Sequence, residues 1–140
     1  MKLWILCFLA AIAVSPACNE RVDKEGVCEN FELGEEFEAR IHDTWCLENG
    51  NLAITFGSIL DDSRCNIVDV ECVWAGKFTM FVDIDLAGDI TRDTFDAVHN
   101  WQDTIQAGAY NIALVKVLPE MRTMNNPVDT SEYTLRIIVE

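Results

Sequence analysis

Among the 140 residues of this chain, the cysteines are the side chains whose chemistry is most informative. A structural zinc site would prefer C-x-x-C pairs or nearby histidines, and the only histidines are His42 and His99. We therefore expect no metal site and no cofactor. Disulfide formation and acylation are the chemistry left for the six cysteines, which are Cys7, Cys18, Cys28, Cys46, Cys65 and Cys72.

Residues 1–17 are typical of a cleavable signal peptide. A lysine precedes an apolar run, Leu3 to Val14, that is too short to span a bilayer. Ser15-Pro16-Ala17 fits the small-x-small rule of ordinary secretion, which would release a soluble protein with an unpaired or intermolecular thiol. The same site also suits lipoprotein processing, in which Cys18 becomes acylated and anchors the chain in the lipid bilayer.

The lipoprotein interpretation leaves an even number of cysteines in the mature chain. Cys7 leaves with the signal peptide and Cys18 takes the lipid, so four cysteines remain, as expected in an oxidising compartment. We expect the disulfides to join neighbours in sequence, which gives the pairs Cys28–Cys46 and Cys65–Cys72. The short loop closed by the second pair predicts a structural role for it.

The most distinctive motif surrounds this second pair. It comprises Asp61, Asp62, Ser63 and Arg64 before Cys65, and Trp74 and Gly76 after Cys72. Arg64 could be an exposed recognition group, but a charged residue beside a disulfide more often holds its loop through a carboxylate or backbone carbonyls. We predict the structural role for Arg64. Trp74 comes just before an alternating strand, so we expect it in the core.

The same motif carries a family resemblance. Asp61-Asp62-Ser63-Arg64-Cys65, followed by Cys72-Val73-Trp74-Ala75-Gly76, resembles the D-S-R-C-P…C-x-W/A-G signature of small uncharacterised Bacteroidota lipoproteins. Asn66 stands where that signature has proline, which affects the expected rigidity of the loop. The resemblance implies an architecture and a lipid-anchored place in the bacterial envelope, at the outer membrane or in the periplasm. It implies no reaction.

Later segments match the same family, and so does the start of the mature chain. The matching segments are Tyr110 to Leu114, Val117-Leu118-Pro119 and Tyr133-Thr134-Leu135. The polar, acidic residues after Cys18 look like the spacer of such lipoproteins. We therefore predict a flexible tether over residues 18–33 that becomes ordered near Cys28.

Charge and missing motifs limit the functions that the chain can have. The formal net charge is −14, and loss of Lys2 with the signal peptide would lower it by one more charge. Nucleic acid and anionic headgroups are poor partners for such a surface. The sequence contains no G-x-S-x-G, no H-E-x-x-H and no Gly-rich phosphate loop. We predict that the protein is not an enzyme and has no catalytic residues.

One acidic cluster keeps a calcium-binding alternative open. Oxygen ligands that gather on a loop can hold Ca²⁺, although their spacing here does not follow an EF-hand and two of them fall on the outward face of a predicted strand. The cluster consists of Asp83, Asp85, Asp89, Asp93 and Asp96.

The elements that position these residues are predicted to be strands, because apolar residues recur with period two. The clearest run is Phe78, Met80, Val82, Ile84 and Leu86, with Phe81 as an exception. Similar alternation marks residues 36–42, 51–56, 110–118 and 132–140, and Glu48 to Asn51 is a hairpin signal.

Only Thr91 to Trp101 could be helical, because Phe95, Val98 and Trp101 recur at three-residue spacing. We expect residues 34–140 to form one all-β domain. The predicted fold is an antiparallel β-sandwich, immunoglobulin-like in general architecture, with two disulfides.

The predicted function follows from this fold and from the predicted location in the bacterial envelope. Rigid sandwiches commonly carry function in their loops, so we expect a non-enzymatic, surface-tethered lipoprotein that binds an unknown protein or ligand through loops or an edge strand. One specific alternative is a proteinase inhibitor that presents the loop from Asp61 to Cys72. A calcium-binding protein and an unrecognised envelope enzyme also stay open as functions.

Overall fold

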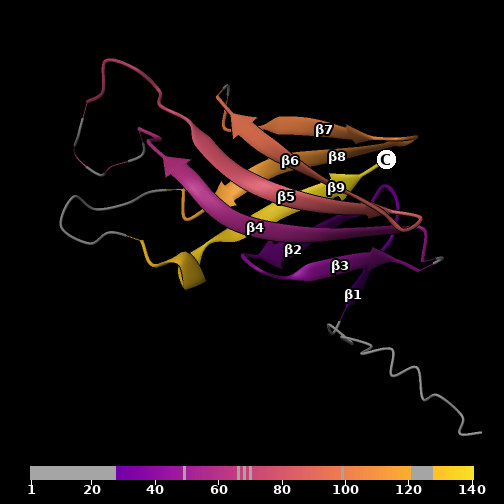
Figure 1. The fold of residues 1–140 in the computed structure, drawn as a ribbon. Coiled ribbons are helices and arrows are strands. Elements are labelled where there is room, and N and C mark those ends of the chain that lie inside the picture. The colour runs from indigo at the N-terminus through magenta and orange to yellow at the C-terminus, as the bar shows by residue number, and fades with distance from the viewer. Residues whose placement is uncertain are drawn as a thin grey trace, which may run out of the picture.

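The computed structural model describes residues 28–48, 50–65, 67, 69, 71–98, 100–120 and 128–140. The predicted signal peptide, Cys18, Asn66 and His99 lie outside the described residues. The described residues form two β-sheets packed face to face, which confirms the all-β sandwich (Figure 1). Their nine strands are β1 (Glu29–Phe31), β2 (Glu36–Arg40), β3 (Thr44–Leu47), β4 (Leu52–Asp62), β5 (Phe78–Leu86), β6 (Asp89–Ala97), β7 (Asp103–Ala107), β8 (Tyr110–Leu118) and β9 (Thr134–Val139).

The two sheets have five and four strands. The first has the order β1-β3-β4-β5-β6 and the second β2-β9-β8-β7. Neighbouring strands are antiparallel, except that β1 runs parallel to β3. A short 3-10 turn, Thr130–Glu132, precedes β9.

The sheet begins earlier than the predicted boundary at residue 34. Strand β1 falls within the range predicted to be tether, and Phe31 is only 3% exposed. Its ring stacks on that of Phe37 in the other sheet, with the centroids 5.2 Å apart. The disulfide from Cys28 to Cys46 of β3 then fixes the start of β1. The five-stranded sheet therefore includes residues that lie before the predicted domain boundary at residue 34.

The predicted period-two alternation builds the core. Leu52, Ile54 and Phe56 of β4 are buried, as are the even-numbered residues from Phe78 to Ile84 in β5. The other sheet supplies the buried face of β9, which is Leu135, Ile137 and Val139. Strands β3 and β4 form the predicted hairpin, with Gly50 at φ 72° in the turn; Asn49 lies outside the described residues.

Thr91 to Trp101, the one range whose spacing allowed a helix, forms no helix in its described residues. This region forms β6, which pairs with β5 from Asp89 to Ala97. The apolar residues that pack inward are Phe95 and Ala97, at the period-two spacing of a strand. Val98 and Trp101 lie beyond the end of the strand, so their three-residue spacing is coincidental.

Both predicted disulfides are present. Cys28 pairs with Cys46, and Cys65 pairs with Cys72. Two disulfides are consistent with export to an oxidising compartment. Within the described ranges, no helix is long and apolar enough to cross a membrane.

Candidate functional site

The segment between β4 and β5 extends beyond the strand ends of the sandwich (Figure 1). We call residues 63–65, 67, 69 and 71–77 the clasped loop, because its two arms are held to each other. The Ser63 N–H donates to the Lys77 carbonyl at 2.9 Å, and the Cys65 N–H donates to the Ala75 carbonyl at 2.7 Å. The Cys65–Cys72 disulfide then closes the loop beyond these hydrogen bonds.

The motif before the disulfide uses alternate residues for two different tasks. Ser63 Oγ donates to Asp61 at 3.0 Å and accepts from the Lys77 N–H at 3.2 Å, so this pair stabilises the base of the clasped loop. The alternate pair, Asp62 and Arg64, is buried, with side-chain exposures of 6% and 0%. After the two register shifts in β4, Asp62 and Arg64 therefore share the inward face of the extended chain.

Arg64 has the structural position that its sequence context predicts. Its Nε and Nη2 both donate to the Asp62 carboxylate at 2.8 Å, and its Nη1 donates to the Val117 carbonyl of β8 at 2.9 Å. The guanidinium also lies 5.4 Å from the centroid of the Phe78 ring. A bidentate ion pair of this kind fixes geometry as well as charge.

Tyr133, just before β9, completes this cluster. Its hydroxyl donates to Asp62 at 2.7 Å. Asp62 belongs to the five-stranded sheet, whereas Val117 and Tyr133 belong to the other side of the sandwich. We call Asp62, Arg64, Val117 and Tyr133 the inter-sheet clamp, because they connect the two sheets at the base of the clasped loop. The sequence motif identifies only the first two.

Gly76 makes the close approach of the two arms possible. A Cβ at this position would lie 1.7 Å from the Ser63 carbonyl oxygen, and the residue has φ 70°. Both the space and the backbone conformation therefore require glycine.

Trp74 is exposed, which corrects the prediction that it lies in the core. Its exposed fraction is 74%, and the neighbouring Val73 is fully exposed. The reason is that the arms of the clasped loop bond to each other, so residues 73 and 74 stay outside the sandwich. Phe78 is the first residue after the loop to enter the core.

An apolar groove lies beside Trp74. Its walls come from Trp74, Ala75 and Gly76 of the clasped loop and from Val98 after β6, and Asp61, Ser63 and Lys77 complete it. The groove has a volume of about 350 Å³. We call it the Trp74–Val98 groove.

The acidic residues of the calcium alternative are engaged separately. Asp83 accepts two hydrogen bonds from Arg92, at 2.6 and 2.8 Å. These hydrogen bonds are the main cause of the lowered pKa of Asp83. Asp85 accepts from the Gly88 N–H at 2.8 Å. In the described part of the chain, no group of three or more His, Cys, Asp or Glu residues is placed to hold a metal ion.

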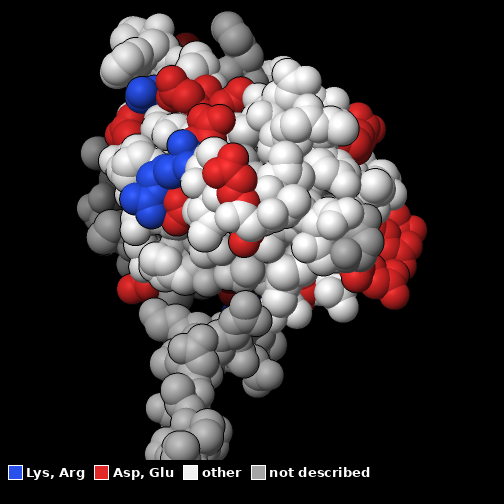
Figure 2. Space-filling view, turned by 45° about the vertical axis from the view of Figure 1, so that its right-hand side comes forward, with Lys and Arg blue, Asp and Glu red and all other residues white. Residues whose placement is uncertain are grey.

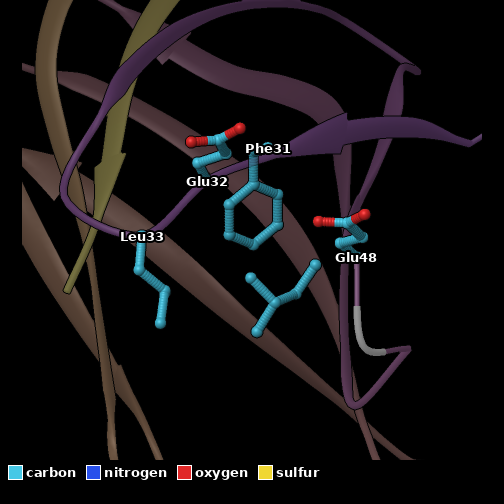
Figure 3. A pocket seen from close by; sticks show the side chains of 5 residues that line it. Phe31, Glu32, Leu33 and Glu48 are labelled. Carbon is cyan, nitrogen blue, oxygen red and sulfur yellow. The ribbon is translucent and has the colours of Figure 1, made fainter.

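A second hollow, of about 530 Å³, lies where β1 and β3 end. Its lining is Phe31, Glu32, Leu33, Leu47 and Glu48. Figure 3 shows the carboxylates of Glu32 and Glu48 on either side of the Phe31 ring. The hollow is shallow and both glutamates are exposed, so its acids are solvated side chains of the rim.

Comparisons with family models, curated proteins and solved structures found no match to this chain. The resemblance to Bacteroidota lipoproteins therefore stays a prediction that rests on the sequence alone.

Proposed function

We propose that this protein is an exported, non-enzymatic binding module, anchored to the bacterial envelope by lipid on Cys18, and that it contacts another protein through the clasped loop. Support for export comes from the two disulfides and from the signal-like residues 1–17. Support for the anchor comes from the sequence around Cys18.

The observation behind the binding role is the exposure of Val73 and Trp74 on a braced loop. Large apolar side chains that gather on a surface often mark an interaction site, and tryptophan is enriched at the residues that dominate binding energy. The disulfide, the two hydrogen bonds between the arms and the inter-sheet clamp hold this pair in place without a partner. A preorganised loop loses little conformational entropy when it binds.

The proteinase-inhibitor alternative assigns the contact to the loop from Asp61 to Cys72. Within that range Arg64 is buried and Asp61 and Ser63 bond to the base of the loop. Among the described residues of the clasped loop, the large exposed apolar side chains are Val73 and Trp74, which follow Cys72. The protein-binding role therefore agrees better with the geometry when its centre is moved to Val73 and Trp74.

Replacing Trp74 by serine should abolish capture of the partner. We expect the immobilised wild-type protein to retain a specific envelope protein that the Trp74→Ser variant does not retain, because the largest exposed apolar contact has gone. Ile90→Ser is the matched control, since Ile90 is 69% exposed on β6. Equal retention by Trp74→Ser and the wild type would rule out the loop as the contact surface.

Acylation of Cys18 has its own test. In a bacterial host, the wild-type chain should partition into detergent and carry a lipid mass increment, and Cys18→Ala should lose both. Cys7→Ala is the control, because Cys7 would leave with the signal peptide. Release of wild type and Cys18→Ala into the medium in equal amounts would show that the protein is a soluble secreted one.

A further inference from the structure

We propose that the Trp74–Val98 groove receives one large apolar side chain from a basic segment of another protein. This inference rests on the proposed function, because it names the subsite and the partner chemistry of the same loop.

The groove is formed by elements that are distant in sequence. One wall is the C-terminal arm of the clasped loop, with Trp74, and the other includes Val98 after β6. Val98 is 42% exposed, so both apolar walls are accessible. A volume of about 350 Å³ is at the small end of the range of ligand pockets. It suits a single anchoring side chain rather than a whole peptide.

Strand pairing connects the two walls, because Phe78, next to Lys77, pairs with Ala97, next to Val98, and polar contacts add to it. Lys77, at the end of the clasped loop, forms an ion pair with Asp96 of β6 at 3.3 Å. Asp96 also accepts a hydrogen bond from the Thr79 hydroxyl of β5 at 2.9 Å. The end of β6 is therefore tied to the base of the loop, and the groove exists before a partner arrives.

The charge around the groove favours a basic partner. Asp61 lines it, Asp96 borders it, and Asp69 and Glu71 are exposed in the clasped loop. The hydrogen bond from Thr79, followed by that from Lys77, lowers the pKa of Asp96, so this carboxylate is ionised at neutral pH. Lys77 is the cation of the groove, and Asp96 already offsets its charge.

The same charges disfavour two other occupants. A second copy of the chain would bring the same acidic loop against itself, and the whole chain has a formal charge of −14. Acidic side chains also cover more of the face in Figure 2 than basic ones. An anionic bilayer would be repelled in the same way. Lysine or arginine beside an apolar anchor would complement the rim.

The test uses the purified protein, with both disulfides formed, and a phage-displayed library of random peptides. Selected peptides should share one large apolar residue flanked by Lys or Arg. Their affinity should fall by about tenfold or more in Trp74→Ser and in Val98→Ser, the loss typical of a central interface residue, and stay unchanged in Ile90→Ser. It should also fall when salt is raised to about 1 M, where the Debye length is short.

The outcomes separate this inference from the proposed function. Peptides that need Trp74 but are indifferent to Val98, or that lack basic residues, would overturn the groove proposal and leave the loop as the contact surface. Peptides that bind equally well to all three variants would overturn both. A dimer in sedimentation that Trp74→Ser dissociates, or co-sedimentation with phosphatidylglycerol vesicles that depends on Trp74, would replace the proposed occupant with a second copy or a membrane.

Discussion

Replacing Arg64 by alanine should lower the free energy of unfolding by about 3 kcal/mol or more, the cost typical of removing one partner from a buried ion pair. The change takes the cation away from the buried Asp62 carboxylate and a donor away from the Val117 carbonyl. It also leaves space beside the Phe78 ring, over which the guanidinium lies. Urea denaturation followed by far-UV circular dichroism would measure the loss as a lower midpoint.

Arg92 provides a matched control within the same chain. It also makes two hydrogen bonds to a carboxylate, that of Asp83, and lies over an aromatic ring, that of Phe81, at 5.3 Å. Its side chain, however, is 63% exposed. We expect Arg92→Ala to cost less than about 1 kcal/mol, because exposed ion pairs contribute little. A urea midpoint that Arg64→Ala leaves unchanged would contradict the clamp and make Arg64 a binding residue.

The sequence predicts the sheets well where one face of a strand is buried. In the first half of β4, in β5 and in β9 the buried apolar residues lie two apart, and a shift by one residue would expose all of them. Register and burial are therefore encoded in the local pattern. The β1–β3 pairing is different, because β1 has only three residues. The Cys28–Cys46 disulfide and the contact of Phe31 with Phe37 hold this strand in place. The disulfide is predicted from the cysteine count, whereas the Phe31–Phe37 contact between the sheets leaves little trace in a short window of sequence.

In the candidate site, too, contacts between residues close in sequence could be predicted, whereas contacts between distant residues could not. The pairing of Asp62 with Arg64 follows from their spacing, since residues two apart share one face of an extended chain. Their partners Val117 and Tyr133 lie 53 and 71 positions away, so they could not be identified before the sheets were known. Tyr133 stands in an alternating run of the sequence, which predicts an inward side chain but does not identify the acceptor of its hydroxyl.

The exposure of Trp74 could not be predicted from sequence, because a large apolar side chain just before an alternating strand is typical of a core residue. Backbone hydrogen bonds from Cys65 to Ala75 and from Ser63 to Lys77 join the two arms of the clasped loop to each other. They keep Trp74 outside the sandwich. The close approach that allows these bonds depends on Gly76. The function proposed for Trp74 therefore depends on the absence of a side chain at Gly76.

Replacing Gly76 by alanine should lower the free energy of unfolding by more than about 3 kcal/mol, because the cost of a left-handed backbone adds to that of a steric overlap. The new Cβ would lie 1.7 Å from the Ser63 carbonyl oxygen and 3.0 Å from the Arg64 Cα, and both belong to backbone that cannot rotate away. The arms of the clasped loop would have to separate, which would also move Trp74 away from Val98. Urea denaturation would measure the first effect, and peptide affinity the second.

Gly50→Ala separates the cost of the left-handed backbone from the cost of the steric overlap. Gly50 has φ 72°, close to the 70° of Gly76, but a Cβ there would meet nothing within 4 Å. Its replacement should therefore cost only the left-handed backbone energy, about 1 to 2 kcal/mol, and leave peptide affinity unchanged. The excess loss in Gly76→Ala then measures the contact between the arms. If the two variants lost equal stability and kept equal affinity, the close approach of Gly76 to Ser63 would not be what holds Trp74 in its exposed position, and the loop would owe its shape to the disulfide alone.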